Sequence, residues 1–142
     1  NNAKYFDYFF NAREDQVPKL YGVEMMDFIR KYQAAWVVYN HSISYVRPAR
    51  VGEWVRIMSR VIWHDHHSVI VEYYMTDDNK EELKTLMWTT MRYVDMKHGK
   101  SKDHEGAVKD FLLPSKSYFF NFRQKRYYLP STNKLIAFEL AK

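Results

Sequence analysis

The chain has 142 residues, a formal net charge of +5 and no cysteine. That length suits one domain with a real hydrophobic core. The lack of cysteine excludes a disulfide framework, a Cys-ligated zinc site and a thiol nucleophile. The positive charge favours anionic partners such as phosphorylated cofactors, although a modest charge also serves solubility alone. No apolar run is long enough to span a bilayer, so we expect no membrane partner and a cytoplasmic location.

The first predicted element is a helix over residues 3–21. Its larger side chains recur at three- and four-residue steps, so most of them share one face. They are Phe6, Phe9, Phe10, Arg13, Val17 and Leu20. Asn2 suits the N-cap, because its side chain can accept from free backbone N–H groups. Pro18 is expected to interrupt the last turn, and a short helical turn is expected within residues 24–33.

The period then changes from helical to alternating. Strands are predicted over residues 35–46, 54–63, 68–76 and 83–96, which are rich in β-branched and aromatic residues. The connections are short, which favours antiparallel neighbours. A lone helix must bury its apolar stripe on such a sheet. The predicted fold class is therefore α+β, with a long central helix packed on an antiparallel β-sheet.

Beyond residue 103 the pattern weakens. Residues 105–114 favour a short helix that stops at Pro114. The tail that follows is basic and aromatic, and it could form a hairpin around Pro130 or pack on a neighbouring subunit. Its segment FFNFRQKRYY interleaves basic and aromatic residues as single-strand binders do. No RNA-binding motif accompanies it, so an extra packed element is favoured and no nucleic-acid partner is expected.

The opening segment NNAKYFDYFFNARE resembles the start of the main helix in hotdog-fold acyl-CoA thioesterases of the 4-hydroxybenzoyl-CoA thioesterase-like family. The family pattern is D-x-x-G-H-V-N-N-A-x-Y-x-x-x-x-x-x-A-R. Its second part is matched by Asn1, Asn2, Ala3, Tyr5, Ala12 and Arg13. YVRPARVGEWVRI, HHSVIVEYYM and WTTMRYVDMKHGK are similar to later strands of the family. The resemblance implies a hotdog domain over residues 1–113 and a C-terminal extension over 114–142, packed on that domain or on a neighbouring subunit.

The first part of the pattern, D-x-x-G-H-V, would lie before Asn1, and so would the first strand of the family. We expect the printed chain to lack an N-terminal segment that carries the catalytic Asp, because it starts within the motif and without methionine. The competing interpretation is that the protein has lost this carboxylate.

Thioester hydrolysis needs a carboxylate, an oxyanion donor and a groove for the acyl-CoA. The resemblance places the donor at the backbone N–H of Asn2, where free N–H groups and the positive helix end converge. Asn1 is expected to shape the turn, and a plain N-cap is the alternative role of Asn2. Tyr5 and Tyr8 lie one turn apart and are expected either to line the acyl pocket or to pack in the core.

Further substrate contacts are expected beyond the helix. The resemblance places His67 and Ser68 near the position at which family members receive the pantetheine arm. Coenzyme A carries several phosphate charges, so basic residues should rim the groove. Arg60 is the main candidate, together with Arg92 and Lys97, although each also suits a solvated surface.

The cluster WHDHHS over residues 63–68 raises the question of a metal site. On a strand, His64 and His66 would share one face and could join a carboxylate elsewhere to bind zinc. No second ligand group stands out by spacing, so a polar hairpin tip is favoured and neither a metal nor another cofactor is expected.

The resemblance implies an acyl-CoA thioesterase that hydrolyses an acyl-CoA to the free acid and CoA. It also implies a homodimer or homotetramer with sites at the subunit interface. The alternative function is a non-catalytic hotdog protein that binds acyl-CoA or acyl-carrier groups.

Overall fold

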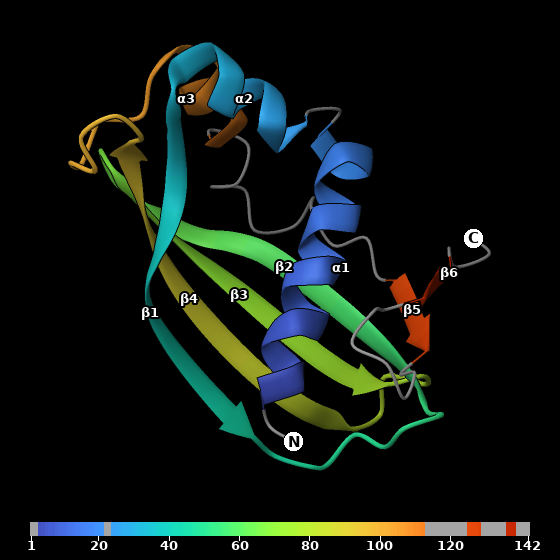
Figure 1. Cartoon of the computed structure of the whole chain (residues 1–142). Helices are drawn as coiled ribbons and strands as arrows, with labels where there is room; N and C mark the ends of the chain where they lie inside the picture. Colours follow the sequence, from blue (N-terminus) through green and yellow to red (C-terminus); the bar gives the residue numbers. More distant parts are fainter. Residues whose placement is uncertain (1–2, 22–23, 113–124, 129–135, 139–142) are drawn as a thin grey trace.

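The computed structural model describes residues 3–21, 24–112, 125–128 and 136–138 (Figure 1). The elements in chain order are α1 (Ala3–Tyr21), α2 (Met25–Tyr32), β1 (Ala34–Tyr45), β2 (Trp54–His64), β3 (Ser68–Asp77), β4 (Leu83–Asp95), α3 (Gly106–Leu112), β5 (Lys125–Tyr128) and β6 (Ile136–Phe138). The predicted helices and strands are present, and the strand ends differ from prediction by a single residue at most. None of the helices in these segments is both long and apolar enough to cross a membrane.

The helix α1 runs to Tyr21, so the predicted interruption at Pro18 is wrong. Proline removes one backbone donor and disfavours the helical conformation of the residue before it. This position is close to the end of the helix, where few further backbone hydrogen bonds depend on it.

The strands form one antiparallel sheet in the order β1-β4-β3-β2-β5-β6. The short connection between β1 and β2 predicted that these two strands would be neighbours, and that prediction is wrong. Instead β1 pairs with β4, from Ala34 opposite Asp95 to Tyr45 opposite Thr85. The loop over residues 46–53 is long enough when extended, at about 3.3 Å per residue, to cross the roughly 15 Å that separate the two strands.

One face of the sheet is covered by α1, which lies across it in Figure 1. Alternate residues of β2 point to this face, and Val55, Ile57 and Val61 are buried there. Ala12 of α1 is fully buried, so its small side chain lets the helix approach the sheet. The main core therefore lies between α1 and the inner face of β2, β3 and β4.

Part of the C-terminal segment joins the same sheet. β5 pairs with β2, from Trp54 opposite Tyr128 to Ile57 opposite Lys125. β6 pairs antiparallel with β5. The described strands agree with the hairpin alternative, whereas the predicted turn residue Pro130 lies outside the described residues.

Candidate functional site

Tyr5 and Tyr8 lie near the start of α1 and point to the sheet. They are 9% and 5% exposed, and their ring centroids are 6.3 Å apart. Burial, together with the nearby Tyr5 and Asp7 side chains, raises the pKa of the Tyr8 hydroxyl. The hydroxyl oxygen of Tyr5 accepts a hydrogen bond of 2.9 Å from the backbone N–H of Ala49. Both side chains thus belong to the core, and Tyr5 also attaches the β1–β2 loop to the helix.

That loop is also attached to the start of β4. The backbone N–H groups of Val46 and Arg47 both donate to the carbonyl oxygen of Lys84, at 2.9 and 3.0 Å. The Lys84 ammonium donates to the carbonyl oxygen of Pro48 at 3.3 Å. Three segments that are far apart in the sequence therefore meet here: the first turns of α1, the β1–β2 loop and the start of β4.

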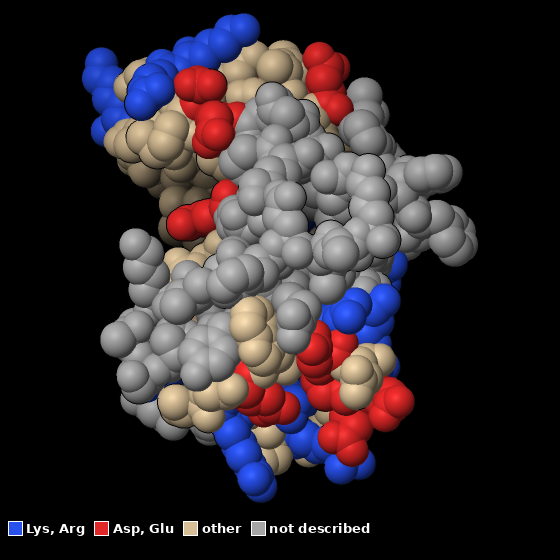
Figure 2. Space-filling model, turned by 90° about the vertical axis from the view of Figure 1, so that its right-hand side faces the viewer, with Lys and Arg blue, Asp and Glu red and all other residues tan. Residues whose placement is uncertain are grey.

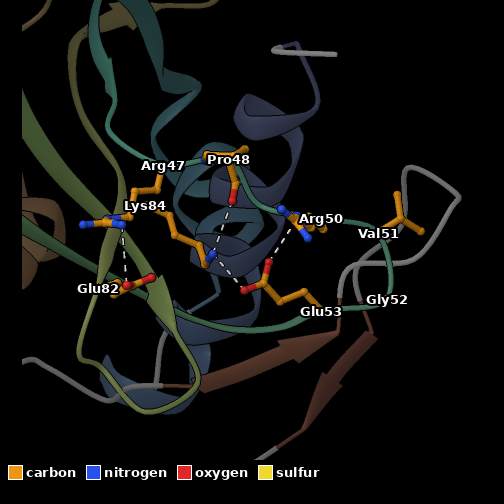
Figure 3. Close-up of a pocket in the computed structure, with 8 residues that line it drawn as sticks. All are labelled: Arg47, Pro48, Arg50, Val51, Gly52, Glu53, Glu82 and Lys84. Atoms are coloured by element: carbon orange, nitrogen blue, oxygen red, sulfur yellow. Dashed lines mark hydrogen bonds and ion pairs between the residues drawn. The ribbon is translucent and has the colours of Figure 1, made fainter.

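A pocket of about 530 Å³ opens at this junction (Figure 3). Its lining includes the basic residues Arg47, Arg50 and Lys84 and the acidic residues Glu53 and Glu82. None of these basic residues was among those predicted to bind phosphate, which were Arg60, Arg92 and Lys97. The available signal was the motif RPAR, in which two arginines flank Pro48 and Ala49 and the proline restricts the backbone.

Arg60 lies on the other face of the sheet. Its neighbours Ser59 and Val61 are buried on the α1 side, and successive strand residues point to opposite faces. Its guanidinium donates to Glu72 Oε1 from Nη2 at 2.8 Å and from Nε at 3.0 Å. The structure therefore does not place Arg60 beside Tyr5 and Tyr8. The Arg60 guanidinium forms an ion pair with Glu72.

His67 lies in the tight turn between β2 and β3, and Ser68 is the first residue of β3. The Asp65 carboxylate accepts from the backbone N–H groups of His67 at 3.0 Å and Ser68 at 2.7 Å. This turn is at the opposite end of β2 from the loop that contacts Tyr5. An 11-residue strand spans about 33 Å, so one subunit does not bring these residues together with Tyr5.

A buried histidine fastens this turn to the segment before α3. His104 is 4% exposed. Trp36 Nε1 donates to His104 Nε2 at 3.0 Å, so Nε2 carries no proton. The proton is then on Nδ1, which donates to the carbonyl oxygen of Asp65 at 3.0 Å. The bond from Trp36 needs the neutral imidazole, whereas Nδ1 can donate to Asp65 in either protonation state. Burial is the largest influence on this side chain, and it lowers the pKa of His104.

This arrangement predicts a pH dependence of stability. Because the pKa of His104 is lower in the folded state than its ordinary value of 6.5, the unfolded chain takes up the proton first as the pH falls. The stabilisation is complete above about pH 6.5 and is lost progressively as the pH falls through the folded-state pKa.

We expect His104→Gln to flatten the dependence of the unfolding free energy on pH between about 7 and 5, by at most the roughly 1.4 kcal/mol per pH unit that one proton contributes. Urea denaturation at several pH values measures the unfolding free energy of each protein, and hence its slope against pH. The nearby residues His64, Asp65 and His67 remain in the variant, so the difference from the original chain isolates His104. Equal slopes of unfolding free energy against pH in the two proteins would show that His104 does not cause this pH dependence.

A second histidine in contact with other side chains, His41, was not singled out by the sequence; it is exposed on one side. The ring of His41 on β1 packs between Phe6 and Phe10 of α1, with centroid distances of 4.7 and 5.7 Å. His41 Nδ1 lies 3.0 Å from Thr89 Oγ1. Burial lowers the pKa of His41, which favours the neutral imidazole. It lines the contact between the helix and the edge strand.

The remaining predictions concern metal binding and the helix start. Among the residues that the structure describes, no group of three or more His, Asp or Glu side chains is close enough to hold a metal ion. Asn1 and Asn2 lie outside the described residues, which begin at Ala3 of α1.

The fold is of the α+β class, because its strands form an antiparallel sheet and the helix α1 packs across one face of that sheet. Residues 1–112 match the thioesterase-like superfamily. The chain belongs to this superfamily, and its predicted relationship to hotdog thioesterases is confirmed. A search of curated proteins finds no match.

Solved structures show the same fold. YbaW, a probable thioesterase from Escherichia coli, is 25% identical, with a TM-score of 0.70 over 82% of this chain and 86% of that chain. A 1,4-dihydroxy-2-naphthoyl-CoA thioesterase from Synechocystis is 12% identical, with a TM-score of 0.68 over 82% of each chain. The protein SAV2348 from Staphylococcus aureus, solved in complex with CoA, is 9% identical, with a TM-score of 0.71 over 82% of this chain and 72% of that chain.

Proposed function

We propose that the protein is an acyl-CoA thioesterase with a hotdog fold, in which α1 is the long central helix. The match of residues 1–112 to the thioesterase-like superfamily carries this proposal. Two relatives of the same fold support CoA as the carrier, since one is a CoA-thioester hydrolase and the other was solved with CoA.

The proposed chemistry uses the start of α1. The carboxylate expected before Asn1 attacks the thioester carbonyl or takes a proton from a water that attacks it, and the developing oxyanion is stabilised by the backbone N–H of Asn2. The tetrahedral intermediate then breaks its C–S bond, and the sulfur leaves as CoA thiol after taking up a proton. In the carboxylate route, water afterwards hydrolyses the acyl-enzyme anhydride, so both routes end in the free acid. Asn1 would shape the turn that precedes the helix. The first turns of α1 are held in place by the buried side chains of Tyr5 and Tyr8, which is the kind of support that an oxyanion donor needs.

The decisive experiment follows thiol release from short, long and aromatic acyl-CoAs. We expect turnover of at least one of them. In Asn2→Pro the backbone donor is removed while proline remains acceptable at a helix start, so kcat should fall by about 100- to 1,000-fold. Asn2→Ala keeps the N–H and is the matched control, with a kcat within about tenfold of the original.

Two results would count against this proposal. Equal kcat values in the two variants would remove Asn2 N–H from the mechanism. A folded chain that binds acyl-CoA but releases no thiol from any of them would favour the alternative function, a non-catalytic hotdog protein that holds acyl groups.

We also propose that two copies of the chain associate through β1. This strand is at one end of the sheet, and Val37, Val38 and Tyr39 on it are 51%, 43% and 66% exposed. A long edge strand with exposed apolar side chains is a template for pairing with another chain. Dimers are the most common closed assemblies, and light scattering measures the mass in solution.

A further inference from the structure

The two charged pairs in the pocket at the β1–β2 loop differ in how firmly they are held. Lys84 is 6% exposed, and its ammonium lies 2.8 Å from the Glu53 carboxylate. The other oxygen of that carboxylate accepts from the backbone N–H of Arg50 at 2.9 Å. Lys84 and Glu53 therefore neutralise each other and, through the contacts drawn as dashed lines in Figure 3, connect the loop to the start of β4.

The arginines at the rim are much less constrained. Arg47 pairs with Glu82 at 3.5 Å, but the two side chains are 58% and 49% exposed. Such exposed pairs contribute little and exchange readily with other ions. Arg50 is exposed, and no carboxylate within the described segments forms an ion pair with its guanidinium. The pocket thus presents two exposed guanidinium groups, that of Arg47 in a weak surface pair and that of Arg50 in none of the ion pairs among the described residues.

Two arginines so placed suit a phosphate ligand. A guanidinium offers several N–H donors in a planar fork that matches phosphate oxygens. The charge in the pocket is mixed, because Glu53 and Glu82 line it beside Arg47, Arg50 and Lys84. Among the coloured residues in Figure 2, basic and acidic side chains likewise lie close to one another. A compact anion fits such a site better than a nucleic-acid backbone, which needs an extended track of positive charge.

The position of the pocket indicates which molecule would carry the phosphate group. Ala49, between the two arginines in the chain, donates to the Tyr5 hydroxyl of α1. This hydrogen bond holds the loop that lines the pocket against the first turns of α1, where the thioester carbonyl is proposed to bind. We infer that Arg47 and Arg50 bind a phosphate group of coenzyme A, an inference that rests on the proposed function.

The test measures binding of coenzyme A and of pantetheine, which lacks phosphate, to the full chain by calorimetry at low salt. We expect R47A and R50A each to weaken coenzyme A binding by about tenfold, which corresponds to roughly 1.4 kcal/mol, and to leave pantetheine binding unchanged. R30A is the matched control, since Arg30 is an exposed arginine on α2 paired with Asp27. It should leave both affinities unchanged.

The outcomes separate this inference from the proposed function. If acyl-CoA is hydrolysed with a KM that neither R47A nor R50A raises, the phosphate site is refuted and the enzyme assignment stands. If both variants weaken coenzyme A binding but no acyl-CoA is turned over, the phosphate site stands and the hydrolase assignment fails. Equal weakening of coenzyme A and pantetheine by these variants would indicate a disturbed loop and would overturn the site.

Discussion

Replacing Phe9 with alanine is expected to lower the free energy of unfolding by about 3–5 kcal/mol. Phe9 is fully buried, and its ring centroid lies 5.4 Å from that of Tyr73 on β3, which is 1% exposed. The substitution removes the central contact between α1 and the sheet and leaves a cavity that close-packed neighbours refill only in part. Urea denaturation of the two proteins measures the difference.

The control for this experiment is on the same helix. Asp7 is exposed, so Asp7→Ala should change the free energy of unfolding by less than about 1 kcal/mol. A loss of similar size in both variants would mean that the effect comes from the helix itself rather than from the core. A loss below about 1 kcal/mol for Phe9→Ala would show that α1 does not cover the sheet as described.

The second large effect is expected at Glu72 on the outer face of the sheet. Glu72 is 5% exposed, and its carboxylate accepts from Arg60 and from Trp88 Nε1, the latter at 2.7 Å. Burial alone would raise the pKa of Glu72, but hydrogen bonds from Tyr74, Trp88 and Arg60 outweigh burial and lower it. The ionised carboxylate is therefore the form that stabilises the folded state.

Glu72→Ala should lower the free energy of unfolding by about 3 kcal/mol. This is the lower end of the range for breaking a buried ion pair, because the Arg60 side chain remains 25% exposed and keeps some contact with water. The double variant Arg60→Met with Glu72→Met should recover much of the loss, since both charges are then removed together.

The pH dependence provides a separate check on Glu72. Its pKa in the folded state is below the ordinary value of 4.5. The stabilisation is thus present above about pH 4.5 and is lost as the pH falls through the folded-state pKa. In Glu72→Ala this acid-dependent part should be absent from urea denaturation curves measured between about pH 5 and 3. An unchanged acid dependence would assign it to other carboxylates.

The site could be predicted only in part from the sequence. The motif at the helix start includes Tyr5, and Tyr8 was added because it lies one turn further along the helix. The structure places both on the sheet side of α1, in the core, and their contact with substrate stays a prediction. The same motif led to the superfamily, which the match over residues 1–112 confirms. Arg60 was a reasonable phosphate ligand by residue type alone. Its partner Glu72 is 12 residues away and meets it only through the antiparallel register of β2 and β3.

What the sequence determined by itself is the set of elements and their order. The hydrophobic period is a local property, so the change from three- and four-residue steps to alternation identified the first helix and the strands that form β1 to β4. The predicted face of the first helix was right only in part, because Phe9 is fully buried whereas Phe6, Phe10 and Arg13 are half-buried and the centre of the contact is made by Tyr5, Tyr8, Phe9 and Ala12.

Only the tertiary structure decided which elements meet. Pairing of β1 with β4 rather than β2 depends on a loop crossing the end of the sheet, and no local period encodes such a crossing. The pocket depends on the same pairing, because its lining combines Arg47 and Arg50 of that loop with Lys84 of β4. Contacts between residues so far apart in the chain are fixed by how the whole core closes, and that depends on all the elements at once.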